Sequence, residues 1–207
     1  MSTVIFDFDG TLADTLPLIA ELTSEFVYKA APDENELTKL RRIPLLRAMR
    51  QMCGWWLLVP ILSSLVRRKM YSKMGNGKIF AGIPEVLRTL KGDGHRLMIF
   101  TTNNVINVHE SLRIHGLETY FDRSDVYHGR IFTKGSGLKH LVEHSGIANS
   151  QCVYVGNETI DVRAAKKAGV RSVAVLWSGT DEDALRQTSP DIVVRTPEEL
   201  LHYVRRV

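Results

Sequence analysis

Short apolar runs alternate with helix-like segments over most of the chain. Such runs occur at Thr3–Phe8, Leu97–Phe100, Cys152–Val155 and Ser172–Leu176. Strands that are apolar throughout are typical of a parallel sheet covered on both faces, and their alternation with helices indicates βαβ units. The pattern therefore predicts a Rossmann-like parallel sheet of the α/β class.

The segments between these runs predict helices. They are expected at Pro84–Gly92, Val105–His115, Gly137–Ser145 and Ile160–Ala168. Shorter β and α segments are expected near Asp125–Tyr127, Asp191–Val194 and Pro197–Val204.

The segment after the first strand is mostly helical. Helices are expected at Leu16–Ala30, Glu36–Met52 and Trp55–Met74. Pro44 and Pro60 should break or kink the second and third of these helices, because proline removes a backbone donor inside a helix. The segment predicts a helical module inserted into the α/β core.

The charge distribution supports two modules. The chain has a net charge of +4, yet residues 39–78 contain ten Lys or Arg and no Asp or Glu. The remaining residues hold 17 bases and 23 acids, so the two parts differ in electrostatic character. We predict an α/β core domain formed by residues 1–14 and 79–207, and a helical domain formed by residues 15–78.

Composition narrows the class of protein. Of the 207 residues, 44% are hydrophobic and 24% are charged, which excludes a disordered, collagen-like or disulfide-framework chain. Cys53 and Cys152 belong to no CxxC or Cys/His cluster, which favours a reducing compartment. The first strand begins at residue 3 and leaves no room for a signal peptide. These features predict a cytoplasmic protein.

One segment of the helical domain, Gln51–Val66, is apolar and uncharged. It has 16 residues, whereas a membrane span needs roughly 20. A buried helix pair is the favoured interpretation, and a membrane-surface contact through Trp55 and Trp56 is the alternative. No stable membrane insertion is expected.

Two acidic residues follow the first apolar run. Asp7 and Asp9 are two positions apart, so a strand places both carboxylates on one side. Carboxylates this close repel each other, and a hard cation such as Mg²⁺ relieves the repulsion. The pair can divide the chemistry, one acting as nucleophile and the other as proton shuttle. Gly10 would let the backbone approach an anionic substrate closely.

Two further strand ends carry polar residues that suit a phosphate. Thr101 and Thr102 follow the second run, where a hydroxyl and the amides that open the next helix can hold an anion. Lys134 is expected in a loop before the helix at Gly137, where its charge can neutralise a phosphate. Lys139 is the alternative lysine, but it falls inside the following helix.

Oxygen ligands follow the third run. Asn157, Glu158 and Asp161 stand at the start of another expected helix, and Asn157 and Asp161 are the candidate metal ligands beside Asp7 and Asp9. For Glu158, a metal contact and a favourable charge at a helix N-terminus are equally good interpretations.

At these residues the sequence resembles the haloacid dehalogenase superfamily. DFDGT at Asp7–Thr11 is similar to the DxDG(T/V) signature of that superfamily. Thr101 matches its second motif, Lys134 its third, and GNETID at Gly156–Asp161 resembles its fourth, usually GDxxxD. The insertion resembles the helical cap of the phosphoglycolate-phosphatase-like branch.

The resemblance implies a role for each residue. Asp7 would form an aspartyl-phosphate and bind Mg²⁺. Asp9 would protonate the leaving group, activate water and offer its backbone carbonyl to the metal. Thr101 and Lys134 would hold the phosphoryl group. Asn157 stands where the family usually has a metal-binding Asp, so it offers the cation a neutral oxygen.

The sequence therefore predicts a Mg²⁺-dependent phosphatase acting on a small phosphorylated metabolite. A phosphoglucomutase-type phosphotransferase and a catalytically weak binding protein are the alternatives. Nucleic acid is not an expected partner, because the basic segment lacks a recognised binding motif and a lid over an anionic substrate explains its charge equally well. The sequence does not predict an oligomeric state.

Overall fold

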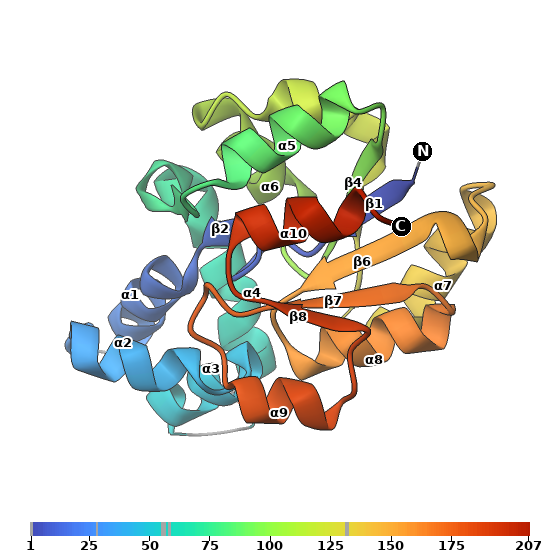
Figure 1. Ribbon diagram of the computed structural model, residues 1–207. Helices are drawn as coiled ribbons and strands as arrows, with labels where there is room; N and C mark the ends of the chain where they lie inside the picture. The colour runs from blue at the N-terminus through green and yellow to red at the C-terminus, as the bar shows by residue number, and fades with distance from the viewer. Residues whose placement is uncertain (1, 28, 55–56, 58, 131–132) are drawn as a thin grey trace.

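A six-stranded parallel sheet forms the centre of the protein (Figure 1). The computed structural model describes residues 2–27, 29–54, 57, 59–130 and 133–207. In sheet order the strands are β5 (Val126–His128), β4 (Arg96–Thr101), β1 (Thr3–Phe6), β6 (Cys152–Gly156), β7 (Arg171–Val175) and β8 (Ile192–Val194). The predicted α/β class is confirmed.

Helices cover both faces of this sheet (Figure 1). One face packs against α5 (Ile83–Gly92), α6 (Val105–Ile114) and α10 (Pro197–Val204). The other face packs against α7 (Lys134–His144), α8 (Thr159–Ala168) and α9 (Glu182–Gln187). Successive side chains of a strand point to opposite faces, so a sheet covered twice needs strands that are apolar at every position.

Short 3₁₀ helices complete the α/β core. They are η3 (Glu118–Tyr120), η4 (Arg123–Asp125) and η6 (Asn149–Gln151). Neither these turns nor α9 were predicted, because segments of three to six residues are too short to carry a helical period.

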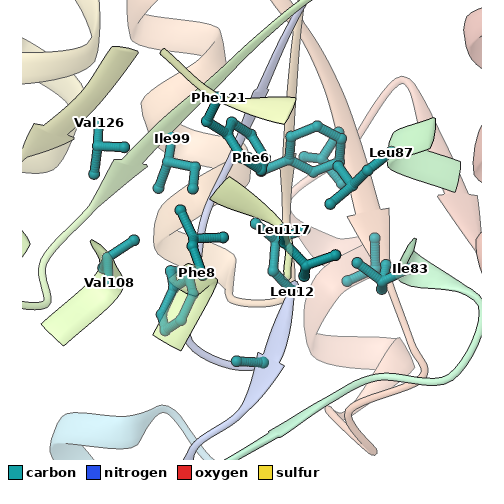
Figure 2. Close-up of a cluster of buried hydrophobic side chains, with 14 of the residues drawn as sticks. Phe6, Phe8, Leu12, Ile83, Leu87, Ile99, Val108, Leu117, Phe121 and Val126 are labelled. Atoms are coloured by element: carbon teal, nitrogen blue, oxygen red, sulfur yellow. The ribbon is translucent and has the colours of Figure 1, made fainter. Parts of the chain in front are cut away.

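The loop after β1 is anchored in the larger apolar cluster (Figure 2). Phe8 and Leu12 are fully buried in it, beside Phe6. The Phe8 carbonyl accepts hydrogen bonds from the amides of Thr11, Leu12 and Ala13. The buried apolar side chains thus fix the turn, and Asp7 and Asp9, which lie between them in the sequence, are held at the carboxyl end of β1.

The helical domain leaves and rejoins the core through a two-stranded ribbon. The ribbon pairs β2 (Ala13–Asp14) with β3 (Lys78–Ile79) in antiparallel register. Between the two strands lie α1 (Leu16–Phe26), α2 (Glu34–Arg41), α3 (Leu45–Cys53), α4 (Val59–Met70) and η2 (Tyr71–Asn76).

The prolines explain where these helices differ from the expected ranges. The predicted helix Glu36–Met52 is split in two, and Pro44 is the N-cap of α3. Pro60 lies in the first turn of α4 and does not kink it, because an N-terminal turn lacks an internal acceptor for the missing proline donor.

The apolar segment Gln51–Val66 contributes to α3 and α4, and Val59, Leu62 and Val66 are buried. Trp55 and Trp56, the candidates for a membrane-surface contact, lie outside the described residues. Among the described helices, none combines the length and hydrophobicity of a membrane span.

Candidate active site

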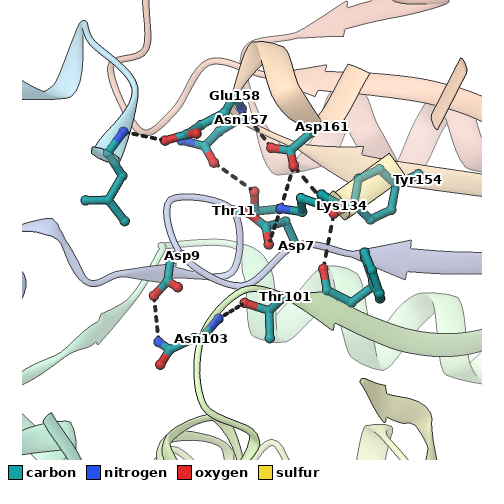
Figure 3. A network of polar contacts seen from close by, with 12 residues as sticks. Asp7, Asp9, Thr11, Thr101, Asn103, Lys134, Tyr154, Asn157, Glu158 and Asp161 are labelled. Atoms are coloured by element: carbon teal, nitrogen blue, oxygen red, sulfur yellow. Dashed lines mark hydrogen bonds and ion pairs between the residues drawn. The ribbon is translucent and has the colours of Figure 1, made fainter. Parts of the chain in front are cut away.

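Three strand ends and one helix start meet at the carboxyl edge of the sheet (Figure 3). Asp7 follows the central strand β1, whose neighbours are β4, ending in Thr101, and β6, followed by Asn157. Lys134 begins α7. In open α/β sheets a ligand usually binds at the carboxyl ends of the strands, beside the strand from which the strand order continues in both directions.

Asp7, Lys134 and Asp161 form a buried charged group. The Lys134 Nζ lies 3.0 Å from Asp7 Oδ1 and 2.6 Å from Asp161 Oδ1. All three residues are at most 6% exposed. The lysine therefore bridges the first and fourth sequence motifs, whose residues Asp7 and Asp161 are 154 positions apart in the chain.

Lys134 is the first residue of α7, so the prediction of a loop up to Gly137 was wrong. Gly135 and Gly137 do not end the helix; they allow it to pack closely. A Cβ on Gly137 would lie 2.9 Å from Phe100 Cζ, and one on Gly135 would lie 3.0 Å from Lys167 Cδ. The tight packing, not a turn, explains the glycines.

Burial and the neighbouring charges shift the pKa values of Asp7 and Lys134. Burial raises the pKa of Asp7 well above its usual range; Lys134 opposes this, while Asp161 and Asp9 add to it. Burial alone would lower the pKa of Lys134, but the attraction of Asp161 and Asp7 raises it well above its usual range. The lysine is therefore a permanent cation, and Asp7 needs further positive charge to ionise fully.

Tyr154 supports the lysine and was not predicted as a site residue. Its hydroxyl donates a hydrogen bond to the Phe100 carbonyl at 3.1 Å, and the Lys134 Nζ lies 5.9 Å from the centre of its ring. Within an apolar strand, a buried tyrosine is indistinguishable from a core residue until the fold is known.

Asp9 is held by two residues that were not predicted for the site. Its Oδ1 accepts hydrogen bonds from Thr15 Oγ1 at 2.7 Å and from Asn103 Nδ2 at 3.0 Å. Burial raises the pKa of Asp9, and these two hydrogen bonds oppose the shift. The Thr101 hydroxyl accepts from the Asn103 amide at 3.0 Å, and the bond from Asn103 to Asp9 ties the ends of β4 and β1 together. The raised pKa favours the protonated form that an acid catalyst needs.

Thr102 borders a small cavity together with Asp9 and Asn103. It lines cavities with Leu45 and Met49 of the helical domain. The structure therefore places Thr101 and Thr102 differently: Thr101 is buried beside Asn103, whereas Thr102 borders the space between the two domains.

Asn157 is fixed by hydroxyl groups. Its Oδ1 accepts from Thr11 Oγ1 at 3.3 Å, and its Nδ2 donates to Ser178 Oγ and Thr180 Oγ1, each at 3.2 Å. Gly10 has a φ of +77°, and a Cβ there would lie 2.4 Å from Asn157 Nδ2. Glycine is thus required by the turn and by the approach of Asn157.

The Gly10 amide already has a partner. It donates to the Ala13 carbonyl at 2.8 Å. A contact of Gly10 with a phosphate stays a prediction, and it would not use this amide.

Both carboxylate oxygens of Asp161 have protein partners. Its Oδ1 pairs with Lys134, and its Oδ2 accepts from the Glu158 amide at 2.9 Å. A Cβ on Gly156 would lie 2.4 Å from the Asp161 side chain, so the glycine makes room for it. A metal contact of Asp161 stays a prediction; in this structure the side chain orients Lys134.

The remaining oxygens suit a hard cation. Asp9, Gly10, Asn157 and Glu158 border a cavity of about 50 Å³, enough for a few water-sized ligands. Together, Asp7, the Asp9 carbonyl and Asn157 offer oxygen atoms only, as Mg²⁺ prefers. Within the described part of the chain, no group of three or more His, Cys, Asp or Glu is arranged around a metal position. These oxygen atoms are therefore of the type that Mg²⁺ binds, but only the Asp7 carboxylate among them can carry a negative charge.

Several hydrogen bonds hold the helical domain against the core, among them one from Asn107 Nδ2 to the Arg67 carbonyl at 2.8 Å. Glu158 Oε1 accepts a hydrogen bond from the Leu45 amide at 2.7 Å. Arg41 donates to both carboxylate oxygens of Asp14 at 2.7 Å, and also to the Ser178 carbonyl at 3.4 Å. The start of α3 and the end of α2 therefore contact the loops that carry the site.

Glu158 gives this contact a pH dependence. Burial, with the charge of Asp161, raises its pKa to about 7 from 4.5. Between these values the folded protein holds a proton that the unfolded chain has lost. Stability therefore falls as the pH rises through this window, and the penalty is complete above pH 7.

We expect Glu158→Gln to stabilise the metal-free protein at pH 8 by on the order of 2 kcal/mol. Glutamine keeps an oxygen acceptor for the Leu45 amide but has no charge to bury. Urea unfolding at pH 4.5 and pH 8 measures the difference, which should be small at the lower pH. An equal change at both pH values would contradict the assignment.

Comparison with known proteins agrees with this geometry. Residues 4–175 match the family model described as haloacid dehalogenase-like hydrolase. A phosphoglycolate phosphatase from Synechococcus elongatus is 32% identical over all of this chain and 99% of its own length. A 5′-nucleotidase from Pseudomonas aeruginosa is 27% identical over 90% of this chain and 88% of its own. A haloacid dehalogenase-like hydrolase from Streptococcus pneumoniae has the same fold, with a TM-score of 0.80, 19% identity and 98% coverage of both chains.

The fold and the site define a Rossmann-like α/β protein with paired aspartates at the tip of its central strand. The chain belongs to the haloacid dehalogenase-like hydrolase family. The predicted resemblance and the predicted enzyme class, a phosphatase of this family, are confirmed.

Proposed function

We propose that the protein is a Mg²⁺-dependent phosphatase that hydrolyses a small phosphorylated metabolite through an aspartyl-phosphate on Asp7. The observation that carries the proposal is the position of Asp7. Its buried carboxylate lies at the tip of the central strand, 3.0 Å from a lysine and two residues before a second acid. A carboxylate so placed is a nucleophile with its charge partner already in position.

The residues divide the reaction between them. Asp7 attacks the phosphorus atom, and the Lys134 ammonium stabilises negative charge on the phosphoryl oxygens. Asp9 gives a proton to the departing oxygen and later takes one from the water that hydrolyses the aspartyl-phosphate. When bound, Mg²⁺ supplies the positive charge that keeps Asp7 ionised and offsets the charge of the phosphoryl group.

The remaining residues are proposed to bind the phosphoryl group and to enclose the site. The Thr101 hydroxyl lies at the end of β4, next to the Asn103 amide, and is proposed to contact a phosphoryl oxygen. Thr102 and Gly10 are proposed to border the bound phosphate. Residues 15–78 are proposed to act as a cap domain on the core formed by residues 1–14 and 79–207. The Arg41 and Glu158 contacts support this function.

The test is phosphate release from a panel of phosphorylated metabolites, including phosphoglycolate and nucleoside monophosphates. Release is expected with MgCl₂ and should be lost after chelation with EDTA and restored by added Mg²⁺. Release that is indifferent to EDTA would contradict the role of the cation. The absence of release from every member would contradict the proposed function and favour a binding protein.

Asn157→Asp tests the unusual fourth motif. We expect the variant to need about tenfold less Mg²⁺ for half-maximal thermal stabilisation, because a carboxylate adds a full charge to the donor set. The Ser178 and Thr180 hydroxyls can donate to the new oxygen, so the substitution should be tolerated. Identical Mg²⁺ titrations of the two proteins would place Asn157 outside the metal site. A thermal response to Mg²⁺ in the variant alone would favour the binding-protein alternative.

A further inference from the structure

A large cavity lies between the two domains, next to the proposed site. It has a volume of about 450 Å³. Leu45, Leu46, Met49, Val59 and Pro60, from α3 and α4, supply an apolar wall. On the core side it is bordered by the ends of β4 and β5. This volume and apolar character are typical of sites for ligands well above the size of phosphate.

The cavity adjoins the space beside Asp9. A smaller cavity of about 30 Å³ is lined by Asp9 and shares Leu45, Met49, Arg67 and Thr102 with the large one. In the proposed reaction, Asp9 is the residue that protonates the leaving group. The part of the substrate attached to that oxygen must therefore extend toward the large cavity.

Arg67 is the charged residue common to both cavities. It is half-buried, and its Nη2 donates to Ser63 Oγ at 3.2 Å. Three bases of this domain have acidic partners: Arg41 pairs with Asp14, Lys69 with Glu25, and Lys73 with Glu21 and Glu25. Arg50 has none among the described residues, but it borders the large cavity only. Among the described residues, no carboxylate lies within 4.0 Å of Arg67. A half-buried guanidinium facing a cavity in this way favours an anionic ligand.

We propose that the substrate is a phosphate monoester whose leaving group is bulky and mainly apolar, carries a second anionic group, and is selected through Arg67. The proposal rests on the proposed function and adds the substrate class. A leaving group as small as glycolate would leave most of the 450 Å³ unfilled. Filling it removes the apolar wall of α3 and α4 from water, which favours longer carbon skeletons.

Binding of non-hydrolysable phosphonates tests the substrate class without requiring turnover. Calorimetry with MgCl₂ present would compare 3-phosphonopropionate, which has the shape of phosphoglycolate, with 8-phosphonooctanoate and octylphosphonate. We expect 8-phosphonooctanoate to bind at least about tenfold more tightly than 3-phosphonopropionate, because its additional methylene groups are buried. Equal or weaker binding of the longer compound would overturn the proposed size and apolarity.

Arg67→Gln, with Arg68→Gln as the matched control, tests the recognition of the second anion. Arg68 is adjacent in sequence, is exposed and borders neither cavity. We expect Arg67→Gln to weaken 8-phosphonooctanoate about tenfold while changing octylphosphonate little, and Arg68→Gln to change neither. An equal loss for both compounds would show that Arg67 binds the phosphoryl group, and no loss for either would show that it binds no anion; each result overturns the assignment.

Turnover separates this proposal from the proposed function. The corresponding phosphate esters should be hydrolysed with the same order of preference as the phosphonates bind. Hydrolysis of all esters without dependence on length or charge would overturn the substrate class and leave the phosphatase intact. Tight, length-dependent phosphonate binding without hydrolysis of any ester would overturn the phosphatase and leave the ligand class intact.

Discussion

Asp7→Asn should abolish phosphatase turnover and leave the protein folded. The amide has nearly the shape of the carboxylate, but it carries no negative charge and is too weak a nucleophile to attack phosphorus. A loss of at least about 10⁴-fold in kcat is expected, because an asparagine cannot form the aspartyl-phosphate. Phosphate release under substrate saturation measures the effect. Near-normal activity of a pure, folded variant would refute Asp7 as the nucleophile.

The same substitution should not destabilise the protein. Burial raises the pKa of Asp7, so its charge is already disfavoured in the metal-free fold. Lys134 retains Asp161 as a partner at 2.6 Å after the change, and no unpaired buried cation results. Thermal unfolding in EDTA should therefore give a melting temperature equal to or above that of the unmodified protein. A clear fall would indicate that Asp7 has a structural role in addition to its chemical one.

The strand ends that form the site were predictable because their signals are local. An apolar run that stops at a polar residue marks a strand tip, and parallel strands bring their tips to one edge. Asp7, Asp9, Thr101 and Asn157 all lie where this rule places them. The α/β class and the break at Pro44 follow from equally local properties of the chain.

The partners of these residues were not predictable because they come from distant segments. Asp9 accepts hydrogen bonds from Thr15, which precedes α1, and from Asn103, which follows β4. Asn157 donates to Ser178 and Thr180 in the loop after β7. Nothing in their neighbouring sequence distinguishes them from ordinary polar loop residues. Only the fold determines which hydroxyls and amides meet.

The sequence left the role of Asp161 open for a different reason. Its residue type allows metal binding and ion pairing equally, and three positions after Glu158 is also the spacing of a side chain that returns to a helix N-terminus. The observed bonds to Lys134 and to the Glu158 amide use both oxygens. One of these bonds depends on the position of Lys134 at the start of α7, whereas the sequence predicted a loop there.

Asp9 is arranged as an acid and base. Thr15 and Asn103 both donate to Oδ1, so Oδ2 has no hydrogen-bond partner among the described residues and remains available for proton transfer. Burial favours its protonated form. An asparagine at this position would keep an acceptor for both donors and keep the backbone carbonyl, so only the transferable proton would be lost.

Asp9→Asn should therefore slow hydrolysis of an alkyl phosphate by about 10²–10⁴-fold, the usual contribution of general acid–base catalysis. An aryl ester such as p-nitrophenyl phosphate should lose much less in the step that forms the aspartyl-phosphate, because its leaving group departs without a proton. Rapid-mixing measurement of p-nitrophenol release isolates that step from the later attack of water, in which Asp9 acts as base for every substrate. The expected pattern is a nearly normal burst of p-nitrophenol followed by slow turnover, with no burst-phase cleavage of the alkyl ester. Equal slowing of the first step for both esters would remove proton donation from the role of Asp9 and leave it as a residue that only positions the substrate or the cation.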